Sequence, residues 1–144
     1  MAGKNKQPLR CSESLLTTGK SILCVKYEGH YPPGSEGNDV AKAMTKYAVE
    51  SYGRHSPDAV MFDLTELEYI WGDAIAGIAV ALIQHTHECP LLFPACVVAR
   101  GRTYKALKAL FEPKWAFGVA GMRLFTTIDQ GMIYLHDATR TAAG

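Results

Sequence analysis

The stretch Ala59-Val-Met-Phe-Asp-Leu-Thr-Glu-Leu-Glu-Tyr-Ile-Trp-Gly-Asp-Ala-Ile-Ala-Gly-Ile78 decides the fold of this 144-residue chain. The apolar run before Asp63 is too short for a helix and is continuous, as in a strand covered on both faces of a parallel sheet. A second apolar segment follows at Leu67–Trp71, and Gly72-Asp73 then opens a helix. Because α/β domains place their functional loops where a strand passes into a helix, we expect a functional loop from Asp63 to Asp73.

Strand and helix patterns alternate along the rest of the chain. The apolar runs predict strands at Leu15–Thr18, Ile22–Tyr27, Ala59–Asp63, Ala95–Ala99 and Met122–Phe125. Apolar residues at helical spacing predict helices from Asn38 or Asp39 to Gly53, at about 73–88, at about 103–111 with Thr103 as cap, and after Thr127. The order favours one α/β domain with a mostly parallel five-stranded sheet, an antiparallel first pair and about four helices.

The helical spacing also selects the residues that should face the core. The first helix is expected to bury Val40, Met44, Tyr47, Ala48 and Ser51, the second Ile75, Ile78, Ala79, Leu82 and Ile83, the third Tyr104, Leu107, Leu110 and Phe111, and the last Met132, Ile133 and Leu135. The domain is expected to cover residues 11–138, between an N-terminal tail at 1–10 and a C-terminal tail at 139–144.

Composition excludes several classes of protein. A hydrophobic content of 48% is enough for a core, so a disordered chain is disfavoured, and a net charge of +1 gives no strong attraction for nucleic acid or anionic lipid. The first ten residues lack the apolar stretch of a signal peptide, and no apolar run reaches the ~18 residues that span a bilayer. We therefore expect a cytoplasmic protein without membrane insertion. Reduced thiols are expected at Cys11, Cys24, Cys89 and Cys96, with Cys24 and Cys96 buried.

Two segments, together with the order of elements, resemble the STAS family, the fold of bacterial anti-sigma factor antagonists and of cytosolic domains of transporters. Asp63-Leu64-Thr65 is similar to the family's Asp-Leu-Ser at the end of the third strand, and Trp71-Gly72-Asp73-Ala74-Ile75-Ala76 stands where its Asp-Ser-Ser-Gly-Leu-Gly opens the next helix. Phe125-Thr126-Thr127-Ile128-Asp129-Gln130-Gly131 is similar to the last strand and its turn. The resemblance implies a non-enzymatic regulator that acts by protein–protein contact through a loop with Asp63, Thr65, Trp71, Gly72 and Asp73.

Asp73 departs from the family at the position of the phosphorylated serine. A carboxylate is not a substrate for a serine kinase. Asp73 is then either a helix N-cap, whose charge suits the positive end of the helix dipole, or a permanent mimic of the phosphorylated state or a carboxylate that faces a partner.

Asp63 also admits two enzymatic interpretations, both disfavoured. Haloacid-dehalogenase phosphatases need a second aspartate two residues after the nucleophile, and that position is Thr65. Response-regulator receivers need acidic residues after the first strand to hold Mg²⁺, and only Glu28 is available. The simplest alternative is that Asp63 hydrogen-bonds the backbone of its own turn. We expect no enzyme, with an Asp63-dependent hydrolase as the less favoured alternative.

Two further clusters are candidate sites for ions. His85 and His87 diverge by about 200° on a helix and cannot share a metal with Cys89 unless the helix unwinds, so we expect no metal and no cofactor. Arg100, Arg102 and Thr103 stand between a strand and the start of a helix, where a phosphate or carboxylate could be held. The alternative is an ordinary exposed loop.

The partner expected from these patterns is therefore another protein. An anti-sigma factor or switch kinase and a component of a membrane transporter both fit the resemblance, and a homodimer is compatible with it. A small anion at Arg100 and Arg102 is the second reading of the same chain. Nucleic acid is not expected, because the lysines at 105 and 108 have no interleaved aromatic residues.

Overall fold

The structure, a computed structural model, describes residues 9–18, 20–31, 35–69, 95–111 and 122–143. Five strands form one sheet in the order β1-β2-β3-β4-β5, with β1 (Arg10–Thr18), β2 (Lys20–Tyr31), β3 (Ala59–Tyr69), β4 (Ala95–Val98) and β5 (Met122–Phe125). β1 is antiparallel to β2, and every other neighbouring pair is parallel. This architecture confirms the predicted α/β class, the mostly parallel sheet and the antiparallel first pair.

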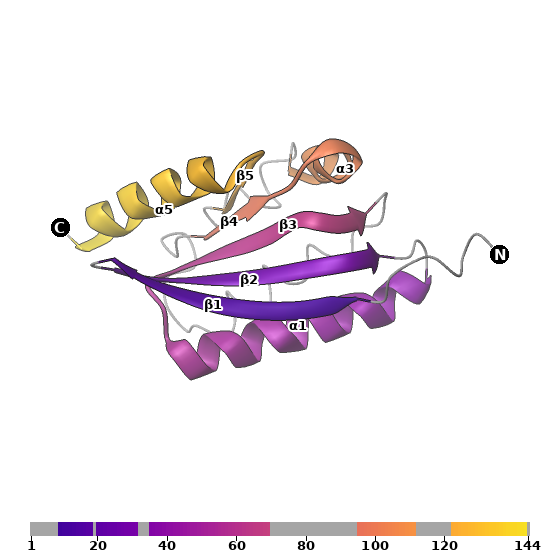
Figure 1. Ribbon diagram of the computed structural model, residues 1–144, viewed down its shortest axis with the longest axis horizontal. Helices are drawn as coiled ribbons and strands as arrows, with labels where there is room; N and C mark the ends of the chain where they lie inside the picture. Colours follow the sequence, from indigo (N-terminus) through magenta and orange to yellow (C-terminus); the bar gives the residue numbers. More distant parts are fainter. Residues whose placement is uncertain (1–8, 19, 32–34, 70–94, 112–121, 144) are drawn as a thin grey trace.

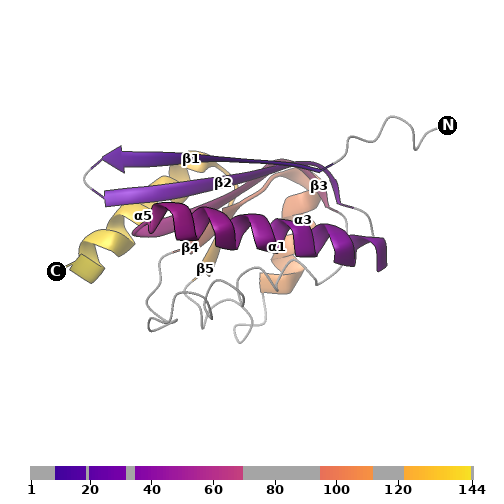
Figure 2. The ribbon, with the colours of Figure 1, turned by 90° about the horizontal axis from the view of Figure 1, so that it is seen from below.

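Three helices pack on the sheet in the described part of the chain, α1 (Ser35–His55), α3 (Gly101–Phe111) and α5 (Ile128–Ala143). Met44 and Ala48 of α1 and Leu107 of α3 are buried against one face, together with Leu23, Val25, Tyr27, Val60, Phe62, Leu64, Leu67 and Val97. Leu135 of α5 is buried against the other face, together with Ile22, Ala59, Met61, Cys96 and Val98. Figure 1 shows α1 and α5 separated by the strands, and Figure 2 shows α1 lying across the sheet.

The register explains why strand residues alternate between these two cores. Along β2, Leu23, Val25 and Tyr27 face α1, while the residues between them face the α5 side. Tyr27 is fully buried, and its hydroxyl donates a hydrogen bond of 2.6 Å to the backbone carbonyl of Met44. Burial raises the pKa of the Tyr27 phenol, so the hydroxyl stays a donor that ties β2 to α1.

The largest correction to the sequence-based prediction concerns β3. Asp63 does not end this strand, and there is no loop from Asp63 to Tyr69, because β3 continues to Tyr69. In the parallel register Lys26 lies opposite Asp63, and Glu28 lies opposite Glu66. An advance of two residues along β2 therefore corresponds to an advance of three residues along β3. This extra residue is a β-bulge, and it masked the alternation that otherwise marks a strand. The remainder of the predicted loop and the predicted helix at 73–88 lie outside the described residues.

Several element boundaries also differ from the prediction. β1 begins earlier than predicted, at Arg10, and ends at Thr18 as predicted. β2 extends beyond the predicted strand at both ends. α1 begins at Ser35 rather than at Asn38 or Asp39, and it passes through Gly53 to His55. α3 begins at Gly101, which puts Thr103 inside its first turn rather than at its cap. β1 begins and α5 ends within the segments assigned to the two tails.

Among the residues whose burial the structure describes, the core follows the prediction with two exceptions. The predicted inward residues of α1 are buried or half-buried, and Leu135 is fully buried. α5 begins directly after Thr127 as predicted, and the structure shows the backbone of Gln130 donating to the hydroxyl of Thr127, which caps the helix. The prediction that Ile133 is buried is wrong, since this residue is 63% exposed on the outer face of α5. Cys96 is buried as predicted, whereas Cys24 is only half-buried.

Candidate functional site

The carboxyl ends of the parallel strands β2, β3 and β4 gather at one end of the sheet, where α/β proteins commonly bind ligands and partners. The bulge in β3 determines which side chains appear there. Because Asp63 and Glu66 are separated by the extra residue, both face the α5 side of the sheet, alongside Lys26 and Glu28 of β2. Leu64 and Leu67 turn to the other face and join the core that α1 and α3 cover. The bulge thus gathers polar groups on one face without exposing the leucines.

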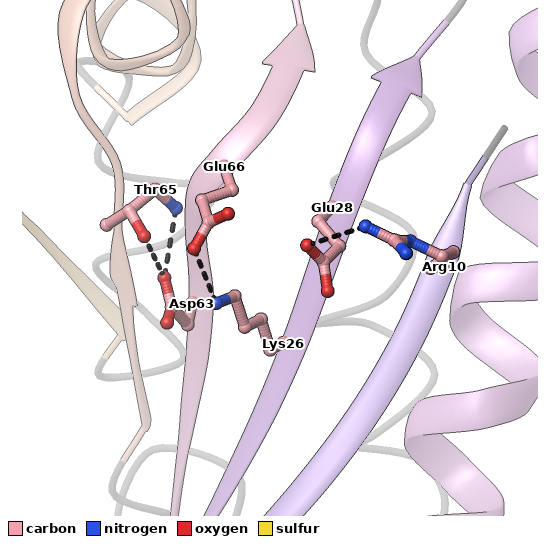
Figure 3. Close-up of polar contacts among 6 residues, drawn as sticks. All are labelled: Arg10, Lys26, Glu28, Asp63, Thr65 and Glu66. Carbon is pink, nitrogen blue, oxygen red and sulfur yellow. Dashed lines mark hydrogen bonds and ion pairs between the residues drawn. The ribbon is translucent and has the colours of Figure 1, made fainter. Parts of the chain in front are cut away.

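Asp63 holds the bulge in place. Asp63 is 8% exposed, and its Oδ1 accepts hydrogen bonds from the Thr65 backbone N–H at 3.0 Å and from the Thr65 hydroxyl at 2.7 Å. Figure 3 shows both contacts. A β-bulge leaves a backbone N–H without its hydrogen bond to the neighbouring strand. An aspartate side chain that accepts the N–H two residues ahead satisfies that donor. The predicted bond from Asp63 to nearby backbone is confirmed, although it stabilises a bulge and not a turn.

Two cross-strand ion pairs cover the polar face next to Asp63 (Figure 3). The ammonium of Lys26 lies 2.6 Å from Glu66 Oε2, and the guanidinium of Arg10 lies 3.2 Å from Glu28 Oε2. The hydrogen bond from Lys26, together with its charge and the more distant charges of Arg100 and Arg10, lowers the pKa of Glu66. The same hydrogen bond, donated by Lys26 to Glu66, raises the pKa of Lys26. Both groups therefore stay charged around neutral pH.

A third cross-strand contact joins the ends of β2 and β3. His30 Nδ1 lies 2.7 Å from Glu68 Oε1, and these residues are directly opposite each other in the parallel register. None of these three pairs was predicted, because the predicted strands ended at Tyr27 and Asp63, whereas β2 continues to Tyr31 and β3 to Tyr69. The signal that would have found them is the alternation of Lys26, Glu28 and His30 with buried or small residues.

The segment from Arg100 to Thr103 connects β4 to α3 at this same end of the sheet. The buried Thr103 hydroxyl donates a hydrogen bond of 2.6 Å to the backbone carbonyl of Leu67 in the extension of β3. The carbonyl of Arg100 accepts the Tyr104 N–H at 3.2 Å, and Gly101 adopts a φ of +58° that favours glycine. Arg100 and Arg102 are exposed. The structure thus brings the Arg100–Thr103 segment and the Asp63–Thr65 bulge onto one edge, which we call the carboxyl edge.

Trp71, Gly72 and Asp73 lie outside the described residues, so their place relative to Arg100 and Arg102 stays a prediction. The same holds for His85, His87 and Cys89. Within the described ranges no three histidine, cysteine, aspartate or glutamate side chains gather as metal ligands. Nor is any helix of those ranges long and apolar enough to cross a membrane.

The thiols of Cys24 and Cys96, which lie on either side of Met61 in the strand register, are suppressed as nucleophiles. Burial, with a smaller contribution from the charge of Asp63, raises the pKa of Cys24 to about 11. Burial raises that of Cys96 to about 12. A thiol reacts through its thiolate, and a raised pKa keeps these two thiols protonated at neutral pH. Neither group therefore has the lowered pKa that marks a reactive cysteine.

The sheet order and the flanking helices are those of a STAS-like α/β domain. The chain is similar to the crystal structure of an anti-sigma factor antagonist from Mycobacterium paratuberculosis, with a TM-score of 0.55 and 18% sequence identity over 89% of this chain and 96% of that one. This likeness confirms the fold that the resemblance in the sequence predicted. No model of a protein family matches the chain, and no curated protein does.

Proposed function

We propose that this protein is a non-enzymatic regulator that binds another protein through its carboxyl edge. The likeness to an anti-sigma factor antagonist carries the proposal, because that protein acts on another protein. A binding role agrees with the exposure of Arg100 and Arg102 beside the β3 extension. An anti-sigma factor or switch kinase is the partner class favoured, with a transporter or signalling component as the alternative, and we expect the interaction in the cytoplasm.

The geometry of Asp63 supports a non-catalytic role. A carboxylate nucleophile must present an oxygen to its substrate, yet Asp63 is nearly buried inside a strand and its Oδ1 already accepts two hydrogen bonds. The test is hydrolysis of p-nitrophenyl phosphate with and without Mg²⁺, by wild type and Asp63→Asn. We expect no turnover above the buffer. Turnover that is lost in Asp63→Asn would establish the hydrolase instead.

Binding to a protein partner is tested by titration calorimetry against the purified anti-sigma factors and switch kinases encoded in the genome of the source organism. Arg102→Glu reverses one exposed charge at the carboxyl edge, and Lys42→Glu reverses one exposed charge on α1 as a matched control. A close charge pair in a protein interface contributes on the order of 1.5–7 kcal/mol, so we expect Arg102→Glu to weaken binding at least tenfold and Lys42→Glu to leave it unchanged. Equal effects of both variants would refute the carboxyl edge as the binding surface.

Asp73 separates a regulatory switch from simple helix capping. If Asp73 mimics a phosphorylated serine, the natural protein is held in the state that releases its partner, and Asp73→Ser gains binding that a kinase then abolishes. If Asp73 caps a helix, Asp73→Ser changes little, while Asp73→Ala lowers stability by about 0.5–2 kcal/mol. We favour the cap, so the expected result is unchanged partner binding by Asp73→Ser and a lowered melting temperature for Asp73→Ala.

The small-anion alternative rests on Arg100 and Arg102, because the Thr103 hydroxyl already donates to Leu67. Titration with inorganic phosphate tests it directly. Saturable binding of phosphate that is lost in Arg102→Glu, together with no protein partner, would favour the anion-binding module over the regulator.

A further inference from the structure

The outer edge of β1 is a surface that the carboxyl edge and its proposed function do not use. β1 runs for 9 residues at one end of the strand order, and among the described residues its one strand partner is β2. In Figure 2 no other described element lies beyond β1 on its outer side. The opposite edge of the sheet, β5, has only 4 residues. An edge strand of this length presents a row of backbone donors and acceptors that another strand can pair with.

Natural proteins usually protect such an edge with free charges, proline or a bulge. β1 contains neither proline nor lysine, and its nine residues pair with β2 without a break in register. Its two charged side chains are both engaged within the chain. Arg10 pairs with Glu28, and Glu13 accepts hydrogen bonds from Ser51 and Arg54 of α1. The outer edge of β1 therefore has no free charge that would repel an approaching strand.

The middle of β1 also exposes apolar surface on both faces of the sheet. Leu15 is 37% exposed and lies opposite Leu23, which faces α1. Leu16 is 41% exposed and lies opposite Ile22, which faces the α5 side. Leu15 and Leu16 are therefore two neighbouring apolar side chains that stay partly exposed at the sheet edge. Such exposure is expected where a second strand pairs with the edge and covers these side chains.

We propose that β1 is a dimerisation edge, through which two copies of this chain pair antiparallel about a two-fold axis at Leu15 and join their sheets into one. An antiparallel strand that pairs with its own copy is self-complementary, as an isologous interface requires. The axis places Leu15 against the partner's Leu15, and Ser14 of each copy beside the partner's Leu16. Ser12–Thr18 is then the paired segment, and it includes one charge, Glu13, already held by α1. A second copy thus meets this edge without opposed charges.

The association state of the purified full-length chain tests the proposal by sedimentation velocity over a range of concentrations. We expect wild type to form a dimer, and Leu15→Lys to weaken it about tenfold or more, because the axis sets two lysines directly opposite each other. Leu16→Lys should weaken it less, since its neighbour across the interface is a serine. Ile133→Lys, at an exposed residue of α5, is the matched control and should leave the dimer unchanged. A monomer at every concentration, or a dimer that Leu15→Lys does not weaken, overturns the proposal.

Disulfide cross-linking tests the register independently. Under mild oxidation Leu15→Cys should form a covalent dimer, because the two introduced thiols meet at the axis. Ser12→Cys is a control on the same strand, and the proposed register separates its two thiols by six residues along the strand direction. Wild type gives the background from the native cysteines. Cross-linking at Ser12 that equals or exceeds that at Leu15 overturns the proposed pairing.

Discussion

Replacement of Glu13 by glutamine should destabilise the protein at neutral pH and should cease to matter in acid. Glu13 extends from β1 toward the end of α1, where its carboxylate accepts hydrogen bonds from Arg54 and from the fully buried Ser51, the latter at 2.8 Å, and contacts His55. Burial tends to raise the pKa of Glu13, but the hydrogen bonds from Arg54, Ser51 and His55 prevail and lower it to about 2. Tyr47 of α1 also faces this carboxylate.

The size of the expected destabilisation follows from the lowered pKa of Glu13. A fall of the pKa from 4.5 to about 2 corresponds to about 3 kcal/mol at 1.36 kcal/mol per pH unit. The side chain of Arg54 is 52% exposed and that of Glu13 is 19% exposed, so solvent screens part of the interaction. We therefore expect Glu13→Gln to lower the free energy of unfolding by about 1–2 kcal/mol at pH 7.

The pH dependence has a definite sign. A carboxyl group with a lowered pKa in the folded protein stabilises it above the ordinary pKa, and loses that contribution as pH falls from 4.5 toward 2. Urea unfolding of wild type and Glu13→Gln between pH 7 and pH 2.5 should show the two free energies converging. Glu50→Gln removes the same charge from an exposed position of α1 and should differ little from wild type at any pH. A difference between wild type and Glu13→Gln that stays constant down to pH 2.5 would refute the reasoning.

Two further substitutions test the packing and the backbone. Gly131→Ala should lower the free energy of unfolding by about 1–2 kcal/mol in urea titrations, since its methyl group would lie 2.8 Å from Met61 Cε and 3.1 Å from both Cys96 Sγ and Val98 Cγ2, and overpacking outweighs the gain in helix propensity. A melting temperature equal to or above that of wild type would contradict this close approach of α5 to the sheet. Ser56→Gly should raise stability by up to about 1 kcal/mol, because Ser56 follows α1 with a φ of 43°, a conformation that glycine adopts without strain. Loss of stability in this variant would show that the serine side chain contributes more than its backbone costs.

The sequence predicted the elements whose patterns are simple. Met122–Phe125 matches β5 residue for residue, and α5 begins directly after Thr127 as predicted. Buried strands such as β4 are continuous apolar runs, so their position and length can be predicted from the local sequence alone. Of the stretches that resemble the STAS family, Asp63–Thr65 lies in β3 and Phe125–Gly131 lies at the β5–α5 junction. The fold that they implied is confirmed.

The prediction failed where a long-range contact decides the conformation. Gly53 is an ordinary helix-stop signal, yet α1 continues to His55, where Arg54 and His55 reach Glu13 on β1. Thr103 has the residue type of a cap, but its hydroxyl bonds Leu67, which is 36 residues away in the sequence. In both cases a tertiary partner outweighs a local preference of about 1 kcal/mol, and no window of sequence contains that partner.

The bulge at Asp63 links the fold to the proposed function. Without the extra residue, the alternation of β3 would turn Glu66 toward the apolar core that α1 and α3 cover, and Leu67 toward the polar face. The bond between Asp63 and Thr65 stabilises the bulge, the bulge keeps Leu67 in the core, and the Leu67 carbonyl accepts the hydroxyl of Thr103 at the start of α3. Asp63 therefore positions Arg100 and Arg102 through structure alone. An aspartate at this point of the sequence can serve a binding edge without ever contacting the partner.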